Sequence, residues 1–293
     1  MSNSQPVAAE PVQRGIARIT TIPPFKPGFM GAGHTASPVI DPNDFPNNDP
    51  FIVLMDDKMD LPPGSHAGEA HPHAGFEIAT FLVEGELRDR DEGFLREGDV
   101  VWMTAGTGVI HNEDVTPLGK SRILQLWMTM PSDERWIPPR IEHMPKDAAP
   151  VRREPGVVAR VYNGRSGDAE VPSKTRVPMT LVDIHLDPGA AFDQLLPASY
   201  NGFVYVLDGD VAADSNAVAT AGQVAWLAPA GTNTMTSLHL VAGERGARAV
   251  LYAGQRQGVP IVSHGPFIGE TRADLMRVSG AYIRGEMPRV SQL

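Results

Sequence analysis

Short apolar runs separated by turn residues fill most of this 293-residue sequence. The runs are rich in Val, Ile, Leu, Phe and Thr, and 29 glycines and 27 prolines are spread between them. Many short strands punctuated by turn signals are typical of an all-β sandwich or barrel. The clearest runs are PFIVLM (50–55), FEIATFLVEGEL (76–87), GDVVWMTAG (98–106), SRILQLWMTM (121–130), PMTLVDIHL (178–186), GFVYVLDGDV (202–211), GQVAWLAP (222–229) and RAVLYAG (248–254).

One stretch near the C-terminus has helical periodicity instead. Within residues 271–287, Leu275, Val278 and Tyr282 recur at helical spacing, and Thr271 stands where an N-cap is needed. We therefore expect a single short C-terminal helix in an otherwise all-β chain.

The pattern of strands and turns occurs twice. Each copy runs from a strand through an acidic–glycine turn to a second strand, then to a strand with a tryptophan and a glycine-rich turn. A common offset across independent landmarks indicates an internal repeat. The landmark pairs are Gly85 and Gly209, Trp102 and Trp226, and Gly106 and Gly231, which are 124, 124 and 125 residues apart.

The repeat predicts two β-domains in tandem. We expect a flexible N-terminal tail over residues 1–15 and a first domain over 16–135. A Pro-rich linker with the start of the second domain follows over 136–175, and the second domain with the helix occupies 176–293.

Charge and cysteine content narrow the possible functions. The formal net charge of −10 disfavours direct binding to nucleic acid or to anionic membranes. The absence of cysteine excludes disulfides, thiolate metal sites and cysteine nucleophiles, so any metal must be held by His, Asp or Glu. No apolar run approaches the roughly 20 residues that a membrane span needs, and the N-terminus lacks a signal-like apolar segment, which predicts a cytoplasmic protein.

Two pairs of potential metal ligands stand out. His71 and His73 are two residues apart, as are His111 and Glu113. Residues two apart on a strand point to the same face, so two such pairs on neighbouring strands can converge. Three imidazoles and a carboxylate suit a divalent transition metal such as Fe, Mn, Ni, Cu or Zn, and leave two positions open in an octahedral shell.

The carboxylate ligand is not settled by spacing. Glu77 has the same strand parity as His71 and His73, so either Glu77 or Glu113 can be the fourth ligand, and the other would orient an imidazole or a water molecule. His66 precedes the pair and is a candidate for the pocket mouth. The second copy has neither ligand pair, which predicts that the C-terminal domain binds no metal.

At these residues the sequence resembles the pirin family of the cupin superfamily. The resemblance covers about residues 45–290. It is carried by HPHAGFE, LVEGE, GDVVWMTAGTGVIHNE, LQLWMTMP and PIVSHGPFIGETRADL. It implies two antiparallel β-barrels of the cupin, or jelly-roll, type, with metal only in the N-terminal one. It also implies that the ligands are His71, His73, His111 and Glu113, that Glu77 lies behind them, and that the metal is Fe(II), with Mn, Ni, Cu, Zn and Co as other candidates.

The resemblance implies two alternative functions. The first is a metal-dependent dioxygenase that opens flavonols such as quercetin with O2, in which Glu113 accepts the hydroxyl proton. Phe76, Trp102 and Met103 would be candidates for the walls of a flat aromatic pocket, although for each of them a place in the barrel core is the stronger expectation. The alternative is a metal- or redox-responsive regulatory protein that contacts a transcription factor or a metabolic enzyme without turnover.

Two positions depart from the family pattern. Ala74 and Thr107 stand where many relatives have arginine. We expect both positions to affect the pocket mouth or a partner surface.

Overall fold

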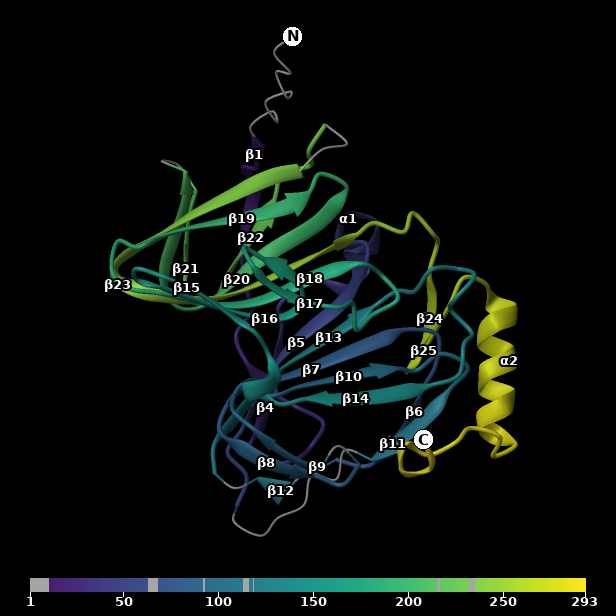
Figure 1. Cartoon of the computed structure of the whole chain (residues 1–293). Helices are drawn as coiled ribbons and strands as arrows, with labels where there is room; N and C mark the ends of the chain where they lie inside the picture. Colours follow the sequence, from purple (N-terminus) through teal and green to yellow (C-terminus); the bar gives the residue numbers. More distant parts are fainter. Residues whose placement is uncertain are drawn as a thin grey trace.

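Two large β-sheets, one from each half of the chain, form the body of the molecule (Figure 1). The computed structural model describes residues 11–62, 68–91, 93–112, 116–117, 119–214, 217–231 and 235–293. Over these residues, strands dominate and only two α-helices occur, α1 (Phe45–Asn48) and α2 (Arg272–Ile283). The all-β prediction is therefore confirmed.

The first sheet has seven strands among the described residues, all from the first half of the chain. In order across the sheet they are β14 (Arg140–Met144), β10 (Val100–Thr104), β7 (Glu77–Glu84), β13 (Ser121–Met128), β5 (Phe51–Met59), β4 (His34–Pro38) and β3 (Lys26–Pro27). Beside it lie two small sheets. One pairs β6 (Ala70–His73) with β11 (Val109–Asn112), and the other holds β12 (Thr116–Pro117), β8 (Glu86–Asp89) and β9 (Gly93–Arg96).

The second sheet has eleven strands within the described ranges. Its main path is β15 (Val151–Glu154), β16 (Val157–Ser166), β18 (Met179–Leu186), β23 (Met235–Gln255), β20 (Tyr200–Asp214), β22 (Gln223–Leu227) and β2 (Ile16–Thr21). Attached to this path are β1 (Val12–Gln13), β17 (Ala169–Val171), β19 (Ala191–Pro197) and β21 (Ala217–Thr220), while β24 (Val262–His264) and β25 (Phe267–Gly269) form a separate pair.

The strand pairing confirms the internal repeat. β10, β7, β13 and β5 follow one another in the first sheet as β22, β20, β23 and β18 do in the second. Trp102 lies opposite Ala79 in the first sheet, and Trp226 lies opposite Phe203 in the second. The two tryptophans are 124 residues apart in the sequence, and so are their two strand partners.

The repeated glycines serve the same purpose in both halves. Gly85 and Gly209 have positive φ values of 84° and 68°. A Cβ atom on Gly85 would lie 2.1 Å from the carbonyl oxygen of Lys120, and one on Gly209 would lie 2.0 Å from that of Gly246. Only glycine fits such a close backbone approach, which explains its place in both copies.

The two sheets share one hydrophobic core. Phe51 from the first sheet and Phe203 from the second meet edge to face, with ring centroids 5.3 Å apart. Burial of each such side chain stabilises the fold by about 1.5–3 kcal/mol, so the two halves support each other.

Buried ion pairs join the sheets around this core. Arg122 donates two hydrogen bonds to Asp56, at 2.9 and 2.7 Å, and the Tyr205 hydroxyl from the other half donates to the same carboxylate at 2.6 Å. In the second half, Arg248 binds Asp183 in the same way and also donates to the backbone carbonyl of Val83 in the first half, at 3.0 Å. The two Asp–Arg pairs occupy matching places in the repeat.

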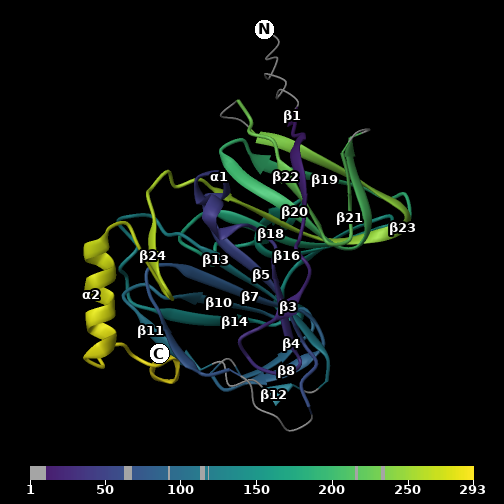
Figure 2. The same ribbon diagram turned by 180° about the vertical axis from the view of Figure 1, so that it is seen from behind.

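The two ends of the chain cross over to the opposite halves (Figures 1 and 2). β1 and β2 pair with β23 and β22 of the second sheet, and Arg14 donates to the carbonyls of Pro197, Ala198, Tyr200 and Ala228. Residues 12–15 of the segment expected as a tail are therefore anchored, and residues 1–10 lie outside the described ranges. At the other end, α2 lies against the first half of the chain.

The C-terminal helix follows its sequence signals. α2 begins after Thr271, whose hydroxyl accepts a hydrogen bond from the Asp274 backbone while the Asp274 side chain accepts one from the Thr271 backbone. This reciprocal capping satisfies amide groups that the first helical turn leaves free. Neither this helix nor any other among the described residues is long and apolar enough to cross a membrane.

Replacing Tyr205 with phenylalanine should lower the free energy of unfolding by about 1.5–3 kcal/mol, because it removes a hydrogen bond to the buried Asp56 carboxylate. Tyr252→Phe is the matched control, since its buried hydroxyl makes no hydrogen bond to the described residues. Urea denaturation measures both variants. Equal losses in the two would contradict the assigned role of Tyr205.

Candidate metal centre

A two-stranded ribbon carries the histidines singled out in the sequence. β6 and β11 pair antiparallel, with His71 opposite His111 and His73 opposite Val109. Both strands are bounded by glycine turns, since Gly75 follows β6 with φ 86° and Gly108 precedes β11 with φ 124°. The amide of Gly75 also donates to the carbonyl of Gly106 at 2.9 Å, which ties the two turns together.

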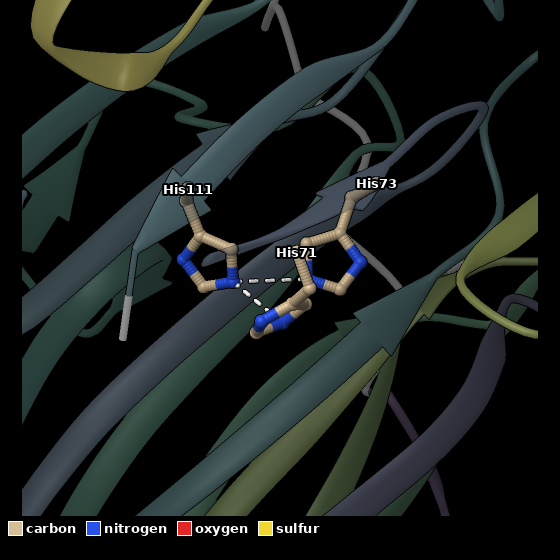
Figure 3. A group of neighbouring side chains, drawn as sticks. All are labelled: His71, His73 and His111. Atoms are coloured by element: carbon tan, nitrogen blue, oxygen red, sulfur yellow. Dashed lines mark hydrogen bonds between the residues drawn. The ribbon is translucent and has the colours of Figure 1, made fainter. Parts of the chain in front are cut away.

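The three imidazoles face one another (Figure 3). The Nε2 atom of His111 lies 3.0 Å from Nε2 of His73 and 2.9 Å from Nε2 of His71. Each of the three residues offers one nitrogen, and these nitrogens lie within 4.8 Å of one another. His73 and His111 are buried, and His71 is partly exposed.

The hydrogen bonding of His71 fixes its tautomer. Its Nδ1 atom lies 2.8 Å from the backbone carbonyl oxygen of Glu69, which can only accept, so Nδ1 carries the proton and Nε2 presents a lone pair. Nε2 of His111 lies close to Nε2 of both His71 and His73. A neutral His111 ring has at most one proton on this nitrogen, so it can donate a hydrogen bond to only one of the two. A cation between the rings can instead accept a lone pair from all three nitrogens.

Burial keeps His73 neutral. Loss of solvent lowers the pKa of the His73 imidazole well below its usual range, and the neighbouring His111 and His71 rings lower it further. The backbone carbonyl of Pro266 acts in the opposite direction on this pKa. Neutral imidazole is the form that binds a metal ion.

The spacing of the nitrogens fits a transition metal. With metal–nitrogen bonds of about 2.1 Å, neighbouring ligands at right angles have nitrogens about 3.0 Å apart, whereas tetrahedral ligands would be about 3.4 Å apart. The two separations that involve His111, 3.0 and 2.9 Å, are close to the right-angled value, and the three nitrogens together lie within 4.8 Å of one another. Three histidines leave positions on such a metal open for other ligands.

Of the two glutamates considered as the fourth ligand, the structure describes only Glu77. Glu113 lies outside the described residues, as does His66. Glu77 does not join the histidines. Its buried carboxylate accepts hydrogen bonds from the Thr104 hydroxyl and from the Arg176 amide, both at 2.7 Å, and burial raises its pKa. The parity argument fails for Glu77 because the chain bends at Gly75 between β6 and β7, so the strand is not continuous.

A cleft of about 760 Å³ opens beside His71 and His73. Two of its walls, Gln125 and Trp127, share one face of β13, and the Trp127 ring lies edge-on to His73 with centroids 5.2 Å apart. Phe29, another wall residue, is 74% exposed. The full lining is Phe29, Met30, Gly31, Gly68, Glu69, Ala70, His71, His73, Gln125, Trp127 and Pro266.

Most of these wall residues were not predicted. The three wall candidates, Phe76, Trp102 and Met103, do not line this cleft, and the stronger expectation of a core position is confirmed for each. Trp102 lies in the core between the sheets, while Phe76 and Met103 share a second core cluster, in which the Phe76 ring also packs against His73 with centroids 5.3 Å apart. The alternation of Gln125 and Trp127 in LQLWMTM was an available signal, because it places both on one face of the strand.

Comparison with known proteins identifies the family. The family model described as Pirin matches residues 36–128, and that described as Pirin C-terminal cupin domain matches residues 181–288. A pirin-like protein of Arabidopsis thaliana is 33% identical over 241 residues, which cover 81% of this chain and 88% of the relative. The chain belongs to the pirin family. Its two repeated β-domains are thus cupin domains.

Two solved structures are also similar to this pirin-family chain. A quercetin 2,3-dioxygenase from Acinetobacter baumannii is 25% identical with a TM-score of 0.83, and the match covers 94% of this chain and 98% of the other. The bacterial pirin YhhW from Escherichia coli, solved in complex with nickel(II), shares the fold with a TM-score of 0.59 at 19% identity, over 82% of this chain and 99% of that one. A group of three histidines able to hold a metal ion is thus present in a member of this family, and the geometry alone does not choose the metal.

Glu77→Gln should leave the amount of bound metal per chain unchanged, because the carboxylate is held by Thr104 and Arg176. His73→Ala should lose most of the metal, because it removes one of three converging donors. Elemental analysis of both variants after nickel loading and desalting makes the comparison. Loss of metal from a folded Glu77→Gln protein would restore Glu77 as a ligand.

The metal-free protein should lose stability as the pH falls below about 6.5. In that range an unfolded chain protonates His73, whereas the folded chain resists protonation because burial lowers this pKa. The unfolded state therefore binds more protons, and the free energy of unfolding falls by up to about 1.4 kcal/mol per pH unit from this residue. Urea denaturation between pH 7.5 and 5.5 should show a smaller decrease for His73→Gln, and identical decreases in the two proteins would refute the assignment.

Proposed function

We propose that this protein is a metal-dependent dioxygenase that opens flavonols such as quercetin with O2, using Fe(II) held by His71, His73, His111 and Glu113. The observation that carries the proposal is the group of three imidazoles beside an aromatic-walled cleft. The similarity to a quercetin 2,3-dioxygenase over nearly the whole chain supports the same reaction class.

The cleft suits a flat aromatic substrate. Its volume of about 760 Å³ lies within the usual range for small-molecule sites, which is about 300–1,000 Å³. Trp127 and Phe29 offer ring faces and edges, Met30 adds an adaptable apolar side chain, and Gln125 supplies a polar amide among them. A hydroxylated ring system can therefore enter with one edge toward the histidines.

The side chains around the histidines keep the donor set in place. The Glu69 carbonyl orients His71, and the Phe76 and Trp127 rings pack against His73 and exclude water from its buried side. When bound, Fe(II) supplies Lewis acidity toward the substrate hydroxyl and redox chemistry with dioxygen. Glu113, two residues beyond His111 in the chain, takes the proton from that hydroxyl in this proposal.

The Fe(II)-loaded protein should consume quercetin in air, followed as loss of the flavonol absorbance. His73→Ala should reduce the rate by at least about 100-fold, because a lost ligand removes the ion that organises the reaction. Circular dichroism shows whether the variant keeps its fold.

Absence of turnover with Fe(II), Mn(II), Ni(II), Co(II) and Cu(II) would rule out the dioxygenase. The same histidines would then serve the alternative function, a regulatory binding protein whose surface responds to the metal or its redox state. Bound metal without turnover is the result expected for that protein.

A further inference from the structure

The last 32 residues of the chain wrap around the histidine ribbon. This C-terminal arm, residues 262–293, comprises β24, β25, α2 and a final 3-10 turn, Val290–Gln292. Figure 1 shows it leaving the second half of the chain and running down beside β6 and β11, where the chain ends. It belongs by sequence to the C-terminal cupin domain, yet it contacts the first one.

The arm holds the chain next to His73. Ala74 is fully buried and bridges to Phe267 of the arm. The amide of Ile268 donates to the Ala74 carbonyl at 2.9 Å, and the amide of Ala74 points to the Pro266 carbonyl at 3.4 Å. Position 74 therefore lies beneath the arm and is not part of a partner surface, whereas its effect on the pocket mouth stays a prediction, since Pro266 lines the cleft.

The arm also holds the chain next to His111. The amide of Ile110 donates to the Pro288 carbonyl at 2.8 Å, and Ile110 bridges to Arg289. Inside the ribbon Ile110 lies opposite Pro72, but its amide points away from the ribbon, toward the arm. The Pro288 carbonyl of the arm thus supplies the acceptor for this amide.

Glycine allows this close approach at both places. A Cβ atom on Gly75 would lie 1.9 Å from the Ile268 carbonyl oxygen, and one on Gly108 would lie 2.7 Å from Cε of Met287. Both glycines also have positive φ, so other residues would strain the backbone as well.

A fully buried arginine joins the arm to the bend after His73. The Arg135 guanidinium donates to the Gly75 carbonyl at 2.7 Å and forms an ion pair with Glu270 of the arm at 3.1 Å. It also donates to the Thr129 hydroxyl and the Met130 carbonyl, both at 2.9 Å. A buried charge needs such partners, so undocking the arm would leave Arg135 without its counter-ion.

Apolar contacts complete the attachment. Val278 of α2 is fully buried and clusters with Ala74, Phe267 and Met287, and Ile110 and Trp136 pack at the edge of this cluster. A two-stranded ribbon is marginally stable by itself. The rigidity of β6 and β11 therefore depends on the arm.

We propose that the C-terminal arm is a clamp that fixes His73 and His111 for metal binding, so that docking of the arm and binding of the metal are coupled. The proposal rests on the metal centre proposed above but not on dioxygenase activity. By thermodynamic linkage, if the docked arm strengthens metal binding, metal binding must stabilise the docked arm to the same extent.

Hydrogen–deuterium exchange on the full-length wild-type protein tests this linkage, with nickel(II) as the probe. Nickel should slow amide exchange in residues 266–289 by at least about tenfold, together with exchange in 70–74 and 108–112. Slowing confined to 70–74 and 108–112 would overturn the clamp while leaving the metal centre intact. No nickel bound at all would overturn the metal centre and the clamp together.

A pair of variants on α2 gives an independent measurement. Val278→Asp places a charge in the contact with Ala74 and Phe267, whereas Met276→Asp changes a side chain that is 69% exposed on the same helix. Competition with a chelator should show nickel binding at least about tenfold weaker for Val278→Asp and unchanged for Met276→Asp. Nickel affinity within twofold of wild type in a folded Val278→Asp protein whose arm exchanges rapidly would refute the proposal. If that variant does not fold, the wild-type exchange experiment still decides.

Discussion

The pairing of β6 with β11 is the constraint on which the candidate site depends. Its register places His111 opposite His71 and Val109 opposite His73, which brings three Nε2 atoms together. Because side chains alternate along a strand, a slip of one residue would turn His111 to the other face of the ribbon. The glycine turns that join one end of the ribbon to the sheet and the arm bound to Ile110 both restrict such a slip.

The local sequence pattern predicted the features of the fold that neighbouring residues determine, namely the strands, the C-terminal helix and the internal repeat. Alternating apolar runs between turn residues gave the strands, Thr271 and the helical spacing after it gave α2, and the offset between Trp102 and Trp226 gave the duplication. The convergence of His71, His73 and His111 also followed from their spacing, because residues two apart on a strand point to the same face and paired strands bring such faces together.

What the sequence did not predict depends on long-range contacts. Gly75 in HPHAGFE was a local sign that the strand is interrupted, but the Ile268 carbonyl that packs against this bend is nearly 200 residues away in the sequence. Trp102 alternates correctly on its strand, but alternation does not say whether a face meets a ligand cleft or the opposite sheet. The crossing of β2 and of the C-terminal arm to opposite halves likewise leaves no local trace.

The crossed ends have a consequence for how the protein is made. The histidines emerge from the ribosome early, but the strand that pairs with β2 and the segment that covers β6 and β11 are synthesised much later. Domains usually fold one after another during translation, beginning at the N-terminus. Here the first half cannot be completed in that order, because the histidine ribbon lacks the partners of Ala74 and Ile110 until the C-terminal arm has been synthesised.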